Sequence, residues 1–205
     1  MGEENQISNS MKLDAILAQY INQYVPTIEK TLVFLRLNKN HIQIPYAQFL
    51  FSMVDYFGLL YTVASTERYD KRDKENFIGF LKSDYFLAKD RCKASLLWFV
   101  RNGLIHQIFP KATGIGTSTE NSLFFKDTQN GNNPTLNLNY FDKELYSAIT
   151  KFIQDLSSKA EYIDRLHKKL IVEHYGLDDY KDFQKEINNS FSGDKEKIFL
   201  DCSTE

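Results

Sequence analysis

The sequence predicts a single, mainly α-helical domain over residues 1–205, with a small β-rich insertion at about 112–139. Apolar residues recur at helical spacing in long stretches on both sides of this insertion. The insertion itself concentrates glycine and proline around short strand-like runs. Hydrophobic residues make up 42% and charged residues 25% of the chain, which is typical of a globular protein with its own core.

The N-terminal part is predicted to form helices that are punctuated by prolines. Ser10 suits the N-cap of a first helix, whose apolar stripe consists of Leu13, Ile16, Leu17, Tyr20, Ile21 and Tyr24. Pro26 breaks or restarts this helix, which continues through Leu35. Pro45 suits the first turn of the next helix, which is predicted to run to about Ser65.

The helix that begins near Pro45 is apolar on nearly all sides, so we expect it at the centre of the fold. A membrane span would fit by length, but the polar residues Gln48, Ser52 and Asp55 favour a buried core helix. Residues 66–76 form a charged connector, and a short helix with Phe77 and Leu81 follows it.

A further helix is predicted to start near Tyr85 and to end at about His106. One stripe of this helix is apolar and suits the core (Leu97, Val100 and Leu104). The opposite stripe is polar or aromatic and is expected to face outward or towards a partner (Arg91, Ser95, Trp98, Asn102 and His106). Gly103 lowers helix stability, which permits a looser last turn in which His106 approaches Arg101.

Residues 112–139 are predicted to form a β-hairpin or small sheet, with a turn at Asn130–Asn133. Gly114-Ile-Gly116 lacks the third glycine and the strand-to-helix setting of a dinucleotide-binding loop. Asp142 is expected to cap a long helix that extends to about Leu170. His167 and His174 read as surface residues, and a short helix after Gly176 precedes a polar tail at about 190–205.

The candidate site is the segment Arg101-Asn102-Gly103-Leu104-Ile105-His106. Arginine is a permanent cation that can bind a phosphate through two parallel hydrogen bonds. Histidine can take and give a proton near neutral pH. Asn102 and His106 are an i, i+4 pair, so they share one face of a helix. This combination predicts a site that holds a phosphate group and transfers protons.

An Arg-Asn-x-x-x-His motif near the end of an apolar helix resembles the signature of the HEPN superfamily. The resemblance covers roughly residues 45–170, and its specific part is Arg101, Asn102 and His106. It implies a helical bundle that dimerises and brings two motifs into one cleft. It also implies a metal-independent endoribonuclease, of the toxin or antiviral defence type, that needs no cofactor. Some members of the family are not catalytic and only bind.

Asp55 is the only formal charge between Pro45 and Glu67, and an unpaired buried carboxylate is costly. Arg101 is its expected partner, which makes Asp55 a supporting residue of the site; the alternatives are a structural ion pair or an aspartate at the surface of a groove. Several residues around the motif are candidates for nucleic-acid binding (Arg91, Lys93, Trp98 and Lys111). The alternative interpretation of their charges is a solvated helix face.

The composition sets further limits on function. The net charge of −2 gives the whole molecule no electrostatic preference for nucleic acid. Cys92 and Cys202 are far apart and predict neither a disulfide framework nor a zinc site. The polar N-terminus is unlike a secretory signal, so a cytoplasmic protein without membrane association is expected. The sequence also lacks a GxSxG elbow, a P-loop and an HExxH motif.

Three functional hypotheses therefore remain. The first is a homodimeric ribonuclease that acts on RNA, with an antitoxin or another protein as a further partner. The second is a non-catalytic dimer of the same type that binds RNA, a nucleotide or a protein. The third is a helical scaffold in which Arg101 and His106 only interact with the carbonyl groups at the end of their helix.

Overall fold

The computed structural model of this protein describes residues 25–66, 73–107, 110, 113–128 and 133–166. Of these residues, 73% lie in seven helices, and a small three-stranded mixed sheet is inserted between the helices. The predicted mainly α class with a small β insertion is therefore confirmed. The predicted helix over 13–24, the residues Lys111, His167, His174 and Cys202, and the C-terminal tail lie outside the described residues.

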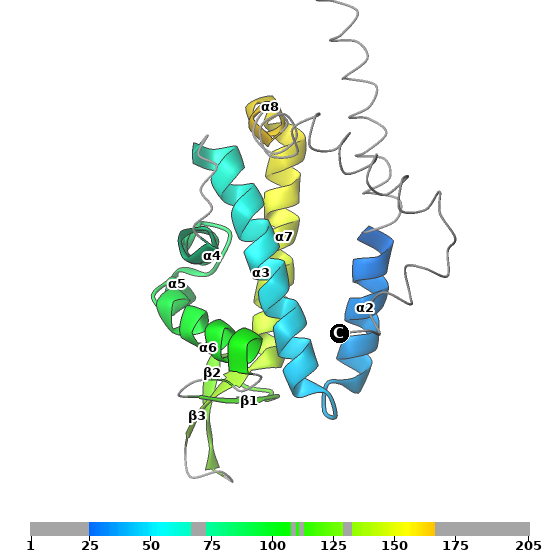
Figure 1. Ribbon diagram of the computed structural model, residues 1–205, viewed down its shortest axis with the longest axis vertical. Coiled ribbons are helices and arrows are strands. Elements are labelled where there is room, and N and C mark those ends of the chain that lie inside the picture. Colours follow the sequence, from blue (N-terminus) through cyan, green and yellow to red (C-terminus); the bar gives the residue numbers. More distant parts are fainter. Residues whose placement is uncertain (1–24, 67–72, 108–109, 111–112, 129–132, 167–205) are drawn as a thin grey trace, which may run out of the picture.

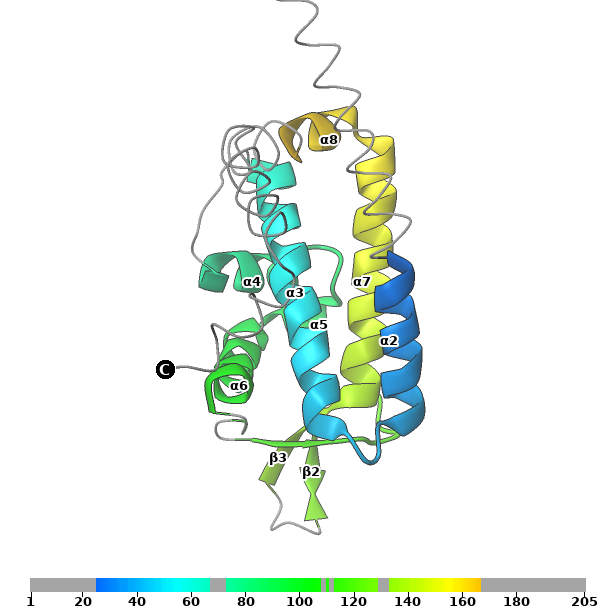
Figure 2. The same cartoon turned by 45° about the vertical axis from the view of Figure 1, so that its right-hand side comes forward.

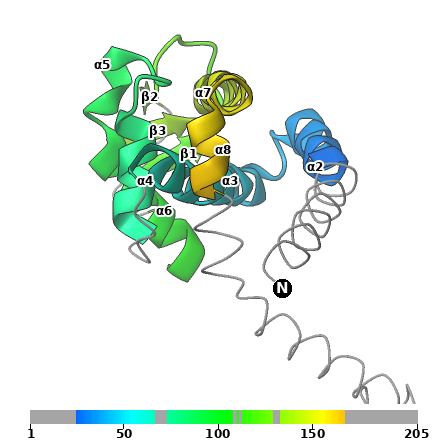
Figure 3. The same cartoon turned by 90° about the horizontal axis from the view of Figure 1, so that it is seen from above.

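Helix α3 (Gln43–Thr66) occupies the centre of the fold, as its apolar sequence predicts (Figures 1 and 2). It packs against α2 (Val25–Asn38), α4 (Asp73–Lys82), α6 (Ala94–Gln107), α7 (Leu138–Ser158) and α8 (Ala160–Leu166). Seen from above, α4 and α6 lie on one side of α3 and α2 lies on the other (Figure 3). Helix α3 is long and apolar enough to span a membrane, but its position here is that of a core helix.

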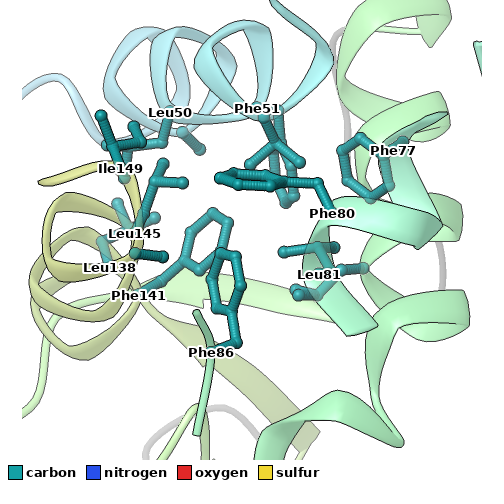
Figure 4. Close-up of a cluster of buried hydrophobic side chains, with 14 of the residues drawn as sticks. Leu50, Phe51, Phe77, Phe80, Leu81, Phe86, Leu138, Phe141, Leu145 and Ile149 are labelled. Atoms are coloured by element: carbon teal, nitrogen blue, oxygen red, sulfur yellow. The ribbon is translucent and has the colours of Figure 1, made fainter. Parts of the chain in front are cut away.

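The core lies where α3, α4 and α7 face one another (Figure 4). Aromatic rings fill much of it: Phe51 of α3 packs against Phe77 of α4 and Phe141 of α7, with ring centroids 6.1 and 5.2 Å apart. All three rings are almost completely buried. Burial of such large side chains supplies the main favourable free energy of folding, and it holds α4 in a defined position beside α3.

The contact between α3 and α4 requires a glycine at position 58. A Cβ atom on Gly58 would lie 2.7 Å from the backbone oxygen of Asn76 in α4. That separation is too short for any other residue, so Gly58 permits the two helices to approach closely. The first turn of α4 is therefore anchored next to the middle of α3.

The sheet consists of β1 (Gly114–Gly116), β2 (Phe124–Asp127) and β3 (Asn133–Asn137), with β3 between the other two strands. Strands β2 and β3 pair antiparallel, as the predicted hairpin requires, while β1 adds to β3 in parallel. Gly114-Ile-Gly116, which lacks the features of a dinucleotide-binding loop, is strand β1. Buried Asn137 then fastens the insertion to α7, because its amide group bonds Glu120, Ser122 and Ser118.

The prediction of one continuous helix from Tyr85 to His106 is wrong. A turn at residues 83–87 is followed by the single-turn helix α5 (Ala88–Arg91), and α6 begins only at Ala94. Phe86 is buried against Phe80 from within this turn. The carboxylate of Asp90 accepts hydrogen bonds from Tyr140 and Lys93 at the end of α5. These tertiary contacts stabilise the break before α6, although the spacing of apolar residues in the sequence favours one continuous helix.

The prediction of one helix from Asp142 to Leu170 is also wrong. Helix α7 starts at Leu138, four residues before Asp142, and ends at Ser158. Lys159 is extended, with φ −112° and ψ 96°, and α8 begins after it. Asp142 is not a helix cap. Its carboxylate instead accepts bonds from Arg36 (2.7 and 2.8 Å) and from the hydroxyl of Tyr46 (2.6 Å).

Replacing Asp142 with alanine should lower the free energy of unfolding by about 2–3 kcal/mol. The hydroxyl of Tyr46, a residue only 1% exposed, would lose its acceptor, and Arg36 would lose its ion pair. The loss should stay below that of a fully buried pair because the Arg36 side chain is 37% exposed. Urea unfolding measures this change. Gln154→Ala, at an exposed position of the same helix, is the matched control, and equal stabilities of the two variants would contradict the prediction.

Candidate functional site

Helix α6 presents the motif because its other face is fixed in the core. Leu97, Val100 and Leu104 are at most 2% exposed, as predicted from the apolar stripe. The remaining side of α6 lines an open cavity of about 540 Å³, to which it contributes Trp98, Arg101, Asn102 and His106. The first turn of α4 lines the same cavity with Asp73, Lys74 and Glu75. We call this space the motif cavity.

Arg101 forms the predicted ion pair with Asp55. Its Nε and Nη2 atoms lie 3.0 and 2.8 Å from Asp55 Oδ2, and Nη1 donates to Asn102 Oδ1 at 3.2 Å. The guanidinium also lies 4.9 Å from the centre of the Trp98 ring, at cation–π distance. With 12% of its side chain exposed, Arg101 is held in one orientation.

The geometry leaves part of the guanidinium available for a ligand. An arginine side chain has five N–H groups, and the contacts with Asp55 and Asn102 use one each on Nε, Nη2 and Nη1. One N–H on Nη1 and one on Nη2 have no partner within the described chain, so the guanidinium keeps two donors for a phosphate ligand. Asp55 therefore orients Arg101 without using all of its donors.

Helix α3 holds α6 at two points that are two turns apart. Asp55 binds Arg101, and Gln48 donates a hydrogen bond of 2.9 Å to the carbonyl of Leu104. That carbonyl belongs to the last turn of α6, where carbonyl groups lack a partner within the helix. The orientation of the motif is thus determined by polar contacts from the central helix as well as by apolar packing.

Burial destabilises the charged form of the Asp55 carboxyl group. Burial raises the pKa of its carboxyl, the Arg101 guanidinium opposes the rise, and the charge of Asp73 adds to it. Its second oxygen, Oδ1, is buried and accepts no hydrogen bond from the residues that the structure describes. The pair thus positions Arg101 at some cost in stability.

The raised pKa of Asp55 predicts a pH dependence of stability. The folded protein binds the Asp55 proton more tightly than the unfolded chain does. This contribution to stability therefore falls as pH rises from the ordinary carboxyl pKa through the raised one. Urea unfolding between about pH 3 and pH 7 should show Asp55→Asn gaining stability relative to the wild type as pH rises. A relative loss over this range would contradict the assignment.

His106 lies in the last turn of α6, exposed, at the edge of the motif cavity. Its ring has no hydrogen bond or ion pair with any other part of the described chain, so both nitrogens are open to a ligand. Gly103 is buried, and α6 continues through it to Gln107 without a break. Arg101 and His106 therefore reach the cavity from a regular helix.

Two of the predicted nucleic-acid-binding residues, Arg91 and Lys93, lie away from the motif cavity. Arg91 pairs with Asp84 at 2.7 Å and Lys93 pairs with Asp90 at 2.9 Å, and neither residue lines the cavity. Of the predicted nucleic-acid-binding residues, Trp98 lines it and Lys111 lies outside the described residues. The cations of the cavity, Lys74 and Arg101, are matched by two carboxylates.

The contribution of α4 was missed by reasoning from the sequence. Asp73, Lys74 and Glu75 were assigned to a connector, whereas they form the first turn of a helix that starts at Asp73. Acidic residues followed by Phe77 at the start of an apolar run are typical of a helix N-terminus. That signal predicts the helix, but it does not predict that its first turn faces Arg101.

The described residues contain no group of three or more histidine, cysteine, aspartate or glutamate side chains placed to hold a metal ion. Comparisons of the chain with protein-family models, with curated proteins and with solved structures found no match in any of the three. The functional interpretation therefore depends on the chemistry of the motif cavity.

Proposed function

We propose that this protein is a metal-independent endoribonuclease of the HEPN type, which acts as a homodimer in toxin or defence-like biology. The observation that carries the proposal is the placement of Arg101 and His106 on one open cavity. Asp55 holds the guanidinium while two of its N–H groups stay available for a phosphate. A phosphate-binding cation and a proton-transferring imidazole that line one cavity are the groups that RNA cleavage needs.

In the proposed reaction, His106 removes the proton from a ribose 2′-hydroxyl. The 2′-oxygen attacks the adjacent phosphorus, and the bond from phosphorus to the 5′-oxygen of the next nucleotide breaks. Arg101 stabilises the negative charge that develops on the phosphate oxygens, and Asn102 keeps the guanidinium in place through its bond to Nη1. The leaving 5′-oxygen takes a proton from the second histidine of the dimer. The products are a 2′,3′-cyclic phosphate and a 5′-hydroxyl.

The outer surface of α6 supports the dimer in this proposal. Three of its large apolar side chains are exposed next to the motif: Leu96 by 39%, Phe99 by 58% and Ile105 by 37%. Exposed apolar groups of this size on one helix are typical of a protein–protein contact. A second copy that covers them would bring its own Arg101 and His106 close to the first pair.

Replacing Phe99 with aspartate should convert the dimer to a monomer and remove RNA cleavage, because a charge would be buried in the apolar contact. Phe34→Asp is the matched control, since Phe34 is 60% exposed but lies on α2. Light scattering gives the mass, and incubation with total RNA gives the activity. A monomeric wild-type protein, or a Phe99→Asp dimer that still cleaves, would contradict the dimeric site.

The second candidate is a non-catalytic dimer that binds RNA, a nucleotide or a protein. The balanced charge of the motif cavity favours it, because two carboxylates oppose the two cations there and weaken attraction for a long polyanion. Nucleotide binding without any cleavage of RNA would support this candidate over the ribonuclease.

A further inference from the structure

The motif cavity is lined by side chains that phosphate binding alone does not require. Its volume of about 540 Å³ lies in the range of small-ligand sites. One wall, from α6, carries the indole of Trp98 and the cation of Arg101, and the other carries the carboxylates of α4. A site for phosphate alone would gain nothing from the aromatic ring and would be weakened by the carboxylates.

Trp98 is held firmly enough to act as a contact surface for a nucleobase. Its ring meets the buried ring of Phe77 edge to face, with centroids 5.3 Å apart, and Arg101 lies against it. Unpaired bases stack on aromatic rings and on guanidinium planes, and each such contact contributes substantially to the binding of single strands. Because the guanidinium lies over the indole, the outer side of this Trp98–Arg101 stack is the surface on which a base would stack.

Asp73 supplies a hydrogen-bonding group that discriminates between bases. Its side chain is exposed, lines the motif cavity and has no ion pair within the described chain. A carboxylate only accepts hydrogen bonds. Guanine presents two adjacent N–H donors on its pairing edge, whereas uracil presents one N–H between two carbonyl oxygens that a carboxylate repels.

We infer that the motif cavity binds a guanine nucleotide, with the base between the Trp98–Arg101 surface and Asp73 and with its 3′-phosphate on Arg101. The inference rests on the proposed function in that it assigns the bound guanosine to the nucleotide on the 5′ side of the scissile bond. Cleavage of RNA then occurs after guanosine. The close packing of α4 on α3 at Gly58 keeps the acidic wall in a defined position.

The test uses Trp98, the single tryptophan of the chain, as a fluorescent reporter. The full chain is titrated with guanosine 3′-monophosphate and, separately, with uridine 3′-monophosphate. Neither nucleotide contains a bond that the enzyme can cleave, so binding is measured independently of activity. We expect the guanine nucleotide to bind at least about tenfold more tightly, as one two-point contact to a base allows.

Asp73→Asn should bring the two dissociation constants to within about twofold of each other, because an amide presents a donor where the guanine N–H groups need acceptors. Asp164→Asn, the same change at an exposed position of α8, should keep the preference. A thermal melt of each variant confirms that it is folded. Equal binding of both nucleotides by the wild type, tighter binding of uridine, or no binding of either would overturn the inference.

Mapping of cleavage sites in an RNA of known sequence separates this inference from the proposed function. Cleavage without preference for guanosine would overturn the guanine site and leave the ribonuclease standing. Selective binding of the guanine nucleotide without any cleavage of RNA would support the guanine site and overturn the ribonuclease.

Discussion

His106→Ala should lower the rate of RNA cleavage by about 10²–10⁴-fold, the contribution of a positioned general acid or base. The stability of the fold should not change, because His106 is exposed and its ring has no hydrogen bond within the described chain. The rate is measured on a fluorescently labelled single-stranded RNA, and stability by thermal unfolding.

His41→Ala is the matched control for this prediction. His41 is also exposed, but it lies in the turn between α2 and α3 and does not line the motif cavity. Its variant should cleave RNA at the wild-type rate. Cleavage that survives in His106→Ala would remove the imidazole from the mechanism.

Arg101→Lys should lower the cleavage rate by about 10²–10³-fold, although the positive charge is kept. The guanidinium binds Asp55 through Nε and Nη2 while two further N–H groups remain for phosphate. A lysine ammonium is a single point of charge on a flexible chain, so it cannot keep the Asp55 contact and hold a phosphate by a planar pair of donors. The loss should appear mainly in kcat, because the donors act on the charge of the transition state.

Arg91→Lys gives the comparison for Arg101. Arg91 pairs with the exposed Asp84 and lies away from the cavity, so its replacement should change the rate less than about twofold, as for other surface ion pairs. Equal losses in the two variants would indicate that general positive charge, rather than the oriented guanidinium, supports the activity.

The Asp55–Arg101 pair is a part of the site that the sequence alone predicts. Asp55 is a lone charge on an otherwise apolar helix, so burial of that helix demands a cation for it, and Arg101 is that cation. The apolar stripe of α6 and the position of α3 follow from the same logic of burial. These predictions depend on the cost of an unpaired charge and on periodicity, both of which are present in the sequence.

The errors have a different origin, because they concern contacts between residues far apart in the chain. Asp142 reads as a helix cap until Arg36 and Tyr46, about a hundred residues away in sequence, are seen to bind it. Likewise, only the tertiary fold places the first turn of α4 across from Arg101.

The most direct test of the proposed function is analysis of the ends of the RNA produced by the purified protein in excess EDTA. The mechanism predicts cleavage that persists with the chelator present, and fragments that carry 2′,3′-cyclic phosphates and 5′-hydroxyls. Mass spectrometry identifies both ends. Cleavage that stops on removal of metal, or fragments with 5′-phosphates and 3′-hydroxyls, would contradict a site in which Arg101 and His106 carry out the reaction.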